Sequence, residues 1–329
     1  MEKIDILMAT YNGEKYLKQQ IESILNQTYS NFRLIISDDC SKDKTKEIIE
    51  EYKTKDKRIE VYFQEKNLGY VKNFEFLLNK VQNGIYMLSD QDDYWLPEKV
   101  EKSLEKLKEK NADFVFGDLE VVDENLNTIY KSFGDFMLLN RKIKKYIDSY
   151  KVNYLYNCVT GCTILARKET LENILPLPKN SKYLIHDHWM GLMSAIYGKV
   201  AYIPEKYIKY RQHGENQVGV NKISHGFSNF EQVRRLFIDV KLGIFGTYVE
   251  NADRFPIDIQ YINKEAYEYF KIIDKKKNIN FKKWNIYHKL YKTEKFSYYI
   301  LNFIIMNLPI IGRPLFKIRY CFLKVLKKR

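Results

Sequence analysis

Three aspartates stand within four residues of one another in the segment 89–95, directly after a short apolar run at 85–88. Carboxylates held this close repel one another, so a fold that keeps them together usually places a cation between them. The pattern therefore indicates a divalent metal ion that carries a phosphate group. The alternative is a solvated acidic turn, but with Tyr94 and Trp95 the segment is too apolar to be simply a solvated turn.

Two more polar clusters follow apolar runs near the start of the chain. Thr10 to Gly13 come directly after one run, and Asp38 to Ser41 come directly after the next. Runs rich in β-branched residues with turn residues behind them are typical of buried strands. We expect strands at Ile4–Ala9, Phe32–Ser37, Arg58–Phe63, Ile85–Ser89, Asp113–Phe116 and Val200–Ile203.

Helical patterns separate these strands. The apolar residues that first recur at the spacing of one helix face are Leu17, Ile21, Ile24 and Leu25. Strands that alternate with helices predict an α/β fold with a doubly wound, mostly parallel sheet. Ligands of such sheets bind beyond the carboxyl ends of the strands, so the three polar clusters should converge on one rim.

The net charge divides the chain into two parts. Residues 1–220 carry 33 basic and 33 acidic side chains, whereas residues 221–329 carry 22 and 9, so the whole excess of +13 belongs to the last third. We predict a catalytic domain at 1–220 and a basic, aromatic-rich helical region at 221–329. A region of this kind suits an anionic surface, such as a membrane or an anionic acceptor.

The segment 297–311 is strongly apolar, but it falls short of the roughly 20 residues that a membrane span needs. Asn302, Asn307 and Pro309 interrupt it. We expect either an interfacial helix followed by the basic end at 313–329, or a helix packed on the catalytic domain.

The four cysteines are scattered, without a second pair to complete a metal-binding framework. We expect buried free thiols in a reducing cytosol rather than a zinc site or a disulfide. The N-terminus lacks a signal-peptide pattern, so nothing indicates export.

Four ordered motifs give a specific resemblance. They are Ile6–Gly13, Ile35–Asp43, Asn67–Gly69 and Ser89–Asp93. Together they resemble the opening of a family 2 glycosyltransferase with the GT-A fold, in which helices flank a Rossmann-like, mostly parallel sheet. The likeness covers roughly residues 3–215 and is closest to bacterial rhamnosyltransferases of surface polysaccharide synthesis.

This resemblance implies a place for the donor nucleotide. Thr10, Tyr11 and Asn12 would frame the nucleotide, and Asp38 or Asp39 would accept a hydrogen bond from the pyrimidine N3–H. A carboxylate at that position rejects bases that lack this donor, because its charge would stay unpaired. The alternative is that the two aspartates cap the next helix.

Two further segments would contact the donor. The turn with Asn67 and Gly69 would lie near the nucleotide, with Lys72 and Asn73 facing it. An ordinary β-to-α turn is the alternative for this segment. Arg211 would pair with phosphate oxygens through its planar guanidinium group, a geometry that lysine does not reproduce.

The acidic segment would be the D-x-D element of the family. Asp90 and Gln91 would lie near the donor, and Asp92 or Asp93 would bind Mn²⁺ or Mg²⁺ between the two phosphates. Such a metal neutralises the charge that develops on the departing nucleoside diphosphate. His213 matches a histidine that in relatives joins the metal or the diphosphate; a structural histidine is the alternative.

The segment from His186 to Trp189 would form the acceptor side, after a small-residue segment at 160–163. An inverting transfer needs a carboxylate that takes the proton of the acceptor hydroxyl, and Asp187 is the candidate for this general base. Many relatives carry Glu-Asp here, so the match rests on Asp187 alone. His186 and His188 could form a metal pair, but we expect them to orient Asp187 or pack beneath it.

The predicted function is an inverting, metal-dependent glycosyltransferase that moves a sugar to a lipid-linked glycan at the cytoplasmic membrane face. The leading donor is dTDP-L-rhamnose, and UDP-hexoses are the alternative. A sugar-nucleotide pyrophosphorylase shares the expected sheet and metal, but the segment Thr10–Glu14 lacks the glycine-rich phosphate loop of such enzymes. A non-enzymatic nucleic-acid or anionic-polymer binder is the remaining option; the charge is confined to the tail and no nucleic-acid motif appears.

Overall fold

The computed structural model describes residues 2–137, 150, 153–154, 157–179, 183–214 and 230–274. The chain divides into two compact units, one of residues 1–177 with 185–219 and one of residues 178–184 with 220–329. The sequence analysis predicted a boundary after residue 220. It did not predict that residues 178–184 belong to the second unit.

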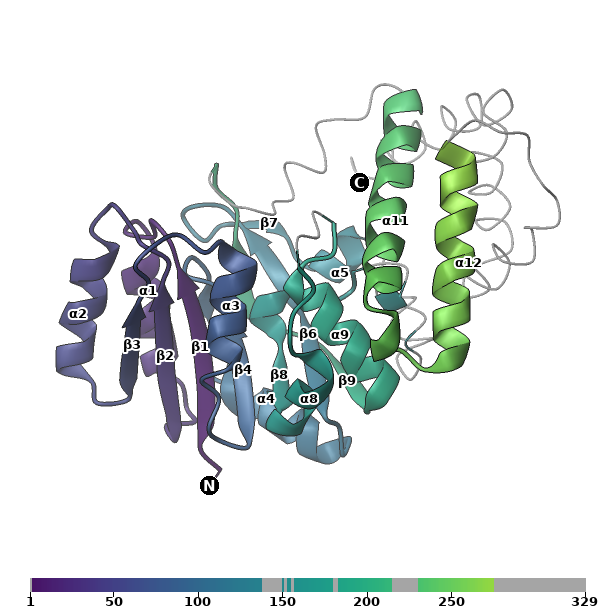
Figure 1. The fold of residues 1–329 in the computed structure, drawn as a ribbon. Helices are drawn as coiled ribbons and strands as arrows, with labels where there is room; N and C mark the ends of the chain where they lie inside the picture. Colours follow the sequence, from purple (N-terminus) through teal and green to yellow (C-terminus); the bar gives the residue numbers. More distant parts are fainter. Residues whose placement is uncertain are drawn as a thin grey trace. The chain divides into compact units, whose positions relative to one another are not determined.

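A nine-stranded mixed sheet forms the centre of the first unit. Its strands are β1 (Ile4–Thr10), β2 (Phe32–Asp38), β3 (Ile59–Phe63), β4 (Ile85–Ser89), β5 (Tyr94–Trp95), β6 (Phe114–Val122), β7 (Thr128–Tyr130), β8 (Leu165–Arg167) and β9 (Val200–Arg211). Their order is β3-β2-β1-β4-β8-β6-β9-β5, with β7 paired to β6 (Figure 1). The first four strands run parallel, and β8 runs antiparallel between β4 and β6.

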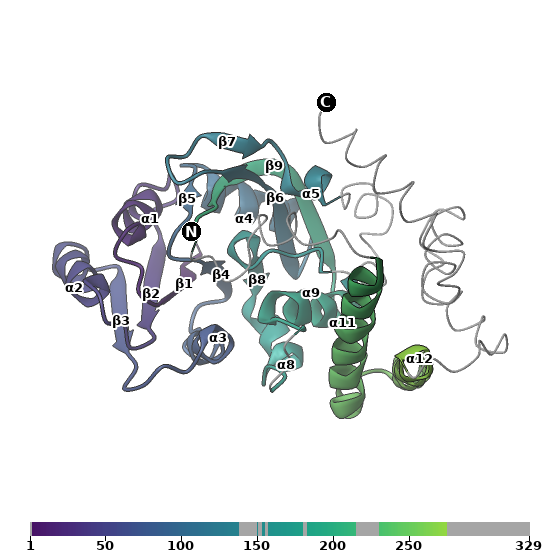
Figure 2. The same ribbon diagram turned by 90° about the horizontal axis from the view of Figure 1, so that it is seen from above.

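Helices cover both faces of this sheet. They are α1 (Leu17–Leu25), α2 (Thr45–Lys55), α3 (Tyr70–Leu78), α4 (Lys99–Glu109), α5 (Phe133–Phe136), α8 (Leu171–Ile174) and α9 (His186–Tyr197). Helices α3 and α9 lie on one face, and α1 and α4 lie on the other (Figure 2). In α1 the buried residues Leu17, Ile21 and Ile24 form the predicted apolar stripe.

The predicted α/β fold is confirmed, with a mostly parallel sheet. Strands β1 to β4 agree with the sequence prediction to within one residue at each end. Strands β1, β2 and β4 are recognisable because almost all of their residues are buried, so they read as continuous apolar runs, whereas β3 is only partly buried. Strands β5, β7 and β8 escaped prediction since runs of two or three residues carry no periodicity.

Strands β6 and β9 are both longer than predicted. Their parallel pairing changes register between Gly117 and Asp118, which face Ile203 and Lys206. Pro204 and Glu205 are the extra residues on β9 at this irregularity. A proline cannot donate to the ladder and is tolerated at a bulge, so the strand continues past it to Arg211.

The described part of the second unit includes two helices, α11 (Phe230–Glu250) and α12 (Ile257–Asp274), joined by the short turn η3 (Ala252–Arg254). Phe245 of α11 stacks on Phe270 of α12 with ring centroids 5.6 Å apart. None of the helices in the described ranges has the length and apolar character that a membrane crossing requires. The predicted apolar helix at 297–311 lies outside the described residues.

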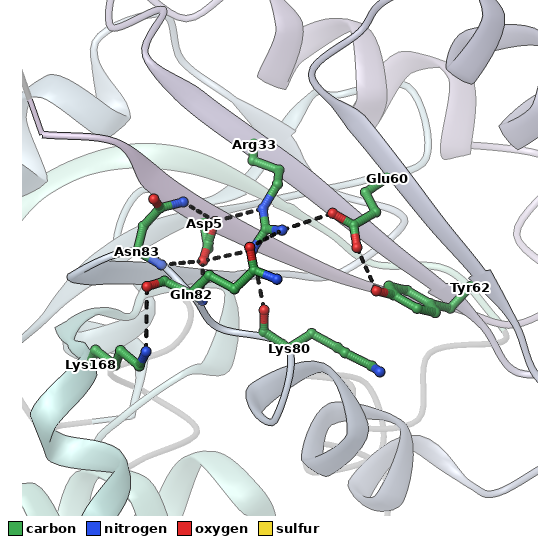
Figure 3. Close-up of polar contacts among 8 residues, drawn as sticks. All are labelled: Asp5, Arg33, Glu60, Tyr62, Lys80, Gln82, Asn83 and Lys168. Atoms are coloured by element: carbon green, nitrogen blue, oxygen red, sulfur yellow. Dashed lines mark hydrogen bonds and ion pairs between the residues drawn. The ribbon is translucent and has the colours of Figure 1, made fainter.

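A buried ion pair joins the strands at the amino edge of the sheet (Figure 3). The Arg33 guanidinium donates to both oxygens of Asp5, at 2.9 and 3.1 Å. The backbone N–H groups of Gln82 and Asn83 donate to the same carboxylate at 2.8 and 2.9 Å. Burial raises the pKa of Asp5, but Arg33 and these hydrogen bonds outweigh it and hold that pKa below the ordinary value of 3.8. The carboxylate therefore ties β1, β2 and the start of β4 together.

Replacing Asp5 by Ala should destabilise the first unit, because it leaves Arg33 without its buried partner. We expect a loss of about 3–5 kcal/mol in the free energy of unfolding measured with urea. In the wild type this contribution is present above pH 3.8 and is lost as pH falls through the lowered pKa of Asp5. Lys55→Ala, which removes an exposed ion pair with Glu51, is the control and should cost about 0–1 kcal/mol. Equal losses in the two variants would contradict a structural role for Asp5.

Candidate active site

Parallel strands place their C-terminal ends on one side of the sheet, and their N-terminal ends, where Asp5 lies, on the opposite side. On the C-terminal side Thr10 of β1 is the register partner of Asp38 of β2, and Met8 of β1 is the partner of Ser89 of β4. The polar clusters that follow these three strands thus meet on one rim, as an open α/β sheet requires of its ligand site.

Asp38 is fully buried beneath this rim. Its Oδ1 accepts a hydrogen bond from Thr10 Oγ1 at 3.0 Å and one from Ser41 Oγ at 2.5 Å, and its Oδ2 accepts one from Ser41 N at 3.0 Å. The carboxylate therefore joins the end of β1 to the turn after β2. These bonds occupy part of the acceptor capacity that the sequence assigned to a nucleotide base.

Asp39 shapes the neighbouring turn. Its two oxygens accept hydrogen bonds from Leu68 N at 2.6 Å and Gly69 N at 2.8 Å, and its backbone oxygen accepts one from Asn67 Nδ2. Gly69 has a φ of +82°, which explains why glycine stands there. The alternative that the two aspartates cap the next helix is wrong, because α2 begins at Thr45 and the bonds of both aspartates go elsewhere.

Asn73 differs from the prediction that it faces the nucleotide. Asn73 is buried, accepts a hydrogen bond from Ser37 Oγ at 2.6 Å and donates one to Ser37 O at 2.9 Å. It fastens α3 to β2, and this use of both side-chain polar atoms corrects its assignment to the donor. Lys72 is exposed, on the first turn of α3.

The segment after β1 is tied to the segment after β2. Asn12 N donates to Ser41 Oγ at 2.9 Å, and Asn12 Oδ1 accepts from Lys42 N at 2.8 Å. Gly13 N donates to Thr45 Oγ1 at 2.8 Å. Asn12 adopts a left-handed φ of +47°, which asparagine tolerates. Tyr11 is 42% exposed and Asn12 is also exposed, whereas Thr10 is buried.

The acidic segment packs against Cys162 of the short helix η1 (Gly161–Thr163). Ligand atoms of Asp90, Asp93 and Cys162 all lie within 4.8 Å of one another. Burial, followed by the charges of Asp92 and Asp187, raises the pKa of Asp90 to about 7. Burial and the charges of Asp92 and Asp90 also raise the pKa of Asp93. Full ionisation of Asp90 and Asp93 is therefore unfavourable in these surroundings.

His213 lies beside this cluster, as predicted for the metal side. Its Nε2 is 2.8 Å from Asp92 Oδ2, and its ring packs against Tyr16 with centroids 4.9 Å apart. The chain thus brings the end of β9 to the acidic segment across 121 residues.

Arg211 does not have the open guanidinium group that phosphate binding would need. It is 2% exposed, and its Nε donates to the backbone oxygen of Asp92 at 2.8 Å. Its two terminal nitrogens donate to Glu124 O and Gln19 Oε1. Arg211 therefore clamps the backbone of the acidic segment, which corrects its assignment to the donor phosphates.

Asp187 lies at the start of α9 and is 6% exposed. Its Oδ1 accepts from Asn157 Nδ2 at 2.9 Å and from His188 N at 2.6 Å, and its Oδ2 accepts from Gly161 N at 3.2 Å. Burial outweighs these bonds and raises the pKa of Asp187 to about 7. A carboxylate with this pKa is suited to take up a proton near neutral pH.

The neighbours of Asp187 face the interior. His186 is buried and stacks on Phe74 with centroids 4.4 Å apart, and burial lowers its pKa to about 4, so its ring is neutral. His188 Nε2 bonds Asn153 O at 2.5 Å, and Trp189 Nε1 donates to Ile174 O at 2.9 Å. His188 and Trp189 therefore anchor α9 rather than face an acceptor, and Nε2 of His188 is taken up by Asn153 O.

Sequence reasoning missed three contributors to this site. Cys162 adds a thiol to the acidic cluster, and Asn157 and Gly161 N hold Asp187. The small-residue segment at 160–163 was the sequence signal for Gly161 and Cys162, whereas nothing in the sequence singled out Asn157. Of the other cysteines in the described ranges, Cys158 is buried and Cys40 is partly exposed.

The residues present fit a divalent cation. Asp93 is buried, and its Oδ2 makes no hydrogen bond within the described part of the chain. Asp90 and Asp92 lie beside it, and the charge of Asp92 raises the pKa of both Asp90 and Asp93. Oxygen-rich groups of this kind suit Mg²⁺ or Mn²⁺, whereas a nearby imidazole and thiol also suit softer metals.

Comparisons with known proteins agree with this arrangement. The family model for glycosyl transferase family 2 matches residues 5–175. The dTDP-rhamnosyl transferase RfbG of Shigella flexneri is 31% identical over 65% of this chain and 74% of its own length. The UDP-Glc:alpha-D-GlcNAc-diphosphoundecaprenol beta-1,3-glucosyltransferase WfgD of Escherichia coli is 26% identical over 81% of this chain and 96% of its own.

The fold comparison covers more of the chain. The crystal structure of S. aureus TarS residues 1–349 in complex with UDP-GlcNAc superposes with a TM-score of 0.57 at 18% identity, over 88% of this chain and 81% of that one. This likeness concerns the fold, and it confirms the expected GT-A architecture. On the family match and the rim of polar residues together, the chain belongs to glycosyl transferase family 2.

Proposed function

We propose that this glycosyltransferase is inverting and metal-dependent, and that it builds a bacterial surface polysaccharide. The observation that carries the proposal is the placement of Asp187. It is a buried carboxylate that accepts a hydrogen bond from Gly161 N at 3.2 Å, and the thiol of the next residue, Cys162, lies within 4.8 Å of ligand atoms of Asp90 and Asp93. A base and a leaving-group site are thus near each other at one rim.

The donor proposed is a nucleoside diphosphate sugar. Tyr11, Asn12 and the turn at 67–69 would surround the nucleotide, with Asp38 or Asp39 offering a remaining lone pair to the pyrimidine N3–H. dTDP-L-rhamnose is the leading choice, which the name of RfbG supports. A UDP-hexose is the alternative, supported by the names of WfgD and of the TarS complex.

Asp90, Asp92, Asp93 and His213 would hold Mn²⁺ or Mg²⁺ at the diphosphate. When bound, such an ion neutralises the charge that develops on the leaving diphosphate. Arg211 keeps the backbone of Asp92 in place through its Nε, and so sets where these carboxylates point.

Asp187 would act as general base. The acceptor hydroxyl oxygen bonds to the anomeric carbon while the bond from that carbon to the diphosphate oxygen breaks, and the hydroxyl proton passes to the carboxylate of Asp187. Attack opposite the leaving group inverts the anomeric configuration. Asn157, Gly161 N and His188 N hold the carboxylate in position for this transfer.

A lipid-linked glycan at the inner face of the membrane is the proposed acceptor. The name of WfgD specifies a diphosphoundecaprenol-linked acceptor for that relative. The excess of +13 in residues 221–329 would support peripheral binding to anionic lipid, at about 1 kcal/mol per basic residue near the surface.

Donor binding should depend on the metal. In calorimetric titrations we expect UDP or dTDP to bind at least about tenfold more weakly in EDTA than with Mn²⁺, a difference of about 1.4 kcal/mol. Asp92→Asn should abolish this difference, because it removes a charged ligand. Glu109→Gln, an exposed carboxyl at the end of α4, should keep it. Equal nucleotide affinity in EDTA and in Mn²⁺ would overturn the metal dependence.

Transfer should depend on the ionised carboxylate of Asp187. Asp187→Asn should reduce turnover by about 10²–10⁴-fold while nucleotide affinity stays within about twofold. In the wild type kcat/KM should rise with pH and level off above the pKa of about 7, since only the ionised form accepts the proton. Glu205→Gln, exposed on β9, serves as the control and should keep the wild-type profile. Substantial turnover in Asp187→Asn would remove this residue as the base.

A further inference from the structure

We infer that Gln91 is a positioning residue that couples metal binding in the acidic segment to nucleotide binding at the end of β1. The inference rests on the proposed function, in which the metal binds at Asp90–Asp93 and the nucleotide lies along Tyr11. Gln91 was expected to contact the donor. Its side chain instead joins the two segments that would hold the two ligands.

The joint consists of two hydrogen bonds to one residue. Tyr11 N donates to Gln91 Oε1 at 2.8 Å, and Gln91 Nε2 donates to Tyr11 O at 3.0 Å. The side-chain amide thus pairs with a backbone amide as a neighbouring strand would. Both polar atoms of the side chain take part, and 80 residues of chain separate the partners.

Gly13 provides the space for this joint. A Cβ added at Gly13 would lie 2.3 Å from Gln91 Oε1, 2.6 Å from its Cδ and 3.2 Å from its Nε2. A methyl group there would therefore displace the Gln91 amide from Tyr11. The three nearest neighbours of that Cβ are all atoms of Gln91, so truncating the Gln91 side chain removes the closest contacts of an alanine at position 13.

The segment after β1 is fixed on its other side. Asn12 and Gly13 are bonded to Ser41 and Thr45 of the segment after β2. Gln91 links the segment after β1 to the acidic segment. A metal that orders the acidic segment therefore favours the nucleotide-binding conformation of the segment after β1, and the nucleotide favours metal binding in turn. Sites joined in this way bind with a coupling free energy that acts equally in both directions.

The test measures UDP affinity by calorimetry with Mn²⁺ and with EDTA, for the wild type and Gln91→Ala. We expect the affinity in EDTA to change by less than about twofold, while the enhancement by Mn²⁺ falls about tenfold, which corresponds to about 1.4 kcal/mol. A residue that merely contacts the nucleotide would weaken binding equally in both conditions. A residue that merely stabilises the fold would lower the unfolding temperature and leave the ratio of affinities unchanged.

Gly13→Ala offers an independent approach to the same joint. It should reproduce the loss of Mn²⁺ enhancement seen in Gln91→Ala, and combining the two substitutions should cause no further loss. The matched controls lie at the amino edge of the sheet. Gly84→Ala adds a Cβ that meets no atom within 4 Å, and Gln82→Ala removes a side chain bonded to Arg33; both should keep the wild-type ratio.

The outcomes separate the two proposals. If the wild type shows no Mn²⁺ enhancement, the metal dependence of the proposed function fails and the coupling fails with it. If the wild type shows the enhancement and Gln91→Ala keeps it, only the role of Gln91 is overturned. Additive losses in the double variant would also overturn it, because they would mean that Gly13 and Gln91 act separately.

Discussion

Repulsion among buried carboxylates is the constraint on which the rest of the site depends. Asp90, Asp93 and Asp187 all have pKa values raised by burial, and the first two are raised further by their acidic neighbours. Asp5 of the same sheet has a lowered pKa, because an arginine and two backbone N–H groups satisfy it. The fold therefore stabilises the carboxylate at its amino edge and leaves those at its carboxyl edge in need of a cation or a proton. That contrast separates structural from reactive aspartates in one molecule.

Holding such a cluster together requires a stiff frame, which the motif residues supply. Arg211 bonds the backbone of Asp92, and the buried carboxylate of Asp38 joins the turn at Ser41 to Thr10. Asp39 fixes the backbone at Gly69. These bonds hold the loops at the rim in one conformation before a ligand binds. Binding therefore loses less conformational entropy than it would with unbonded loops.

The fold was largely predictable from the sequence, and the partners of individual atoms were not. Strands β1, β2 and β4 are almost fully buried, so their apolar runs identify them, whereas β8 has three residues and no periodicity. The location of the polar clusters at the rim was predictable as well, since each cluster follows the end of a strand. Contacts such as Arg211 with Glu124 or Asp93 near Cys162 join segments far apart in the chain, and residue type does not specify them.

The corrections at Asn73, Arg211, His188 and Trp189 have a common cause. A motif identifies polar residues at the ligand-binding end of the sheet, but it does not say what they bind. Such a side chain can hydrogen-bond the protein backbone as well as a ligand. The predicted donor residues that stay exposed at the rim include Tyr11, at 42% exposure, Asn12, Asn67 and Lys72. Discrimination among nucleotide sugars should accordingly depend on such open side chains more than on the motif residues whose polar atoms are already bonded within the rim.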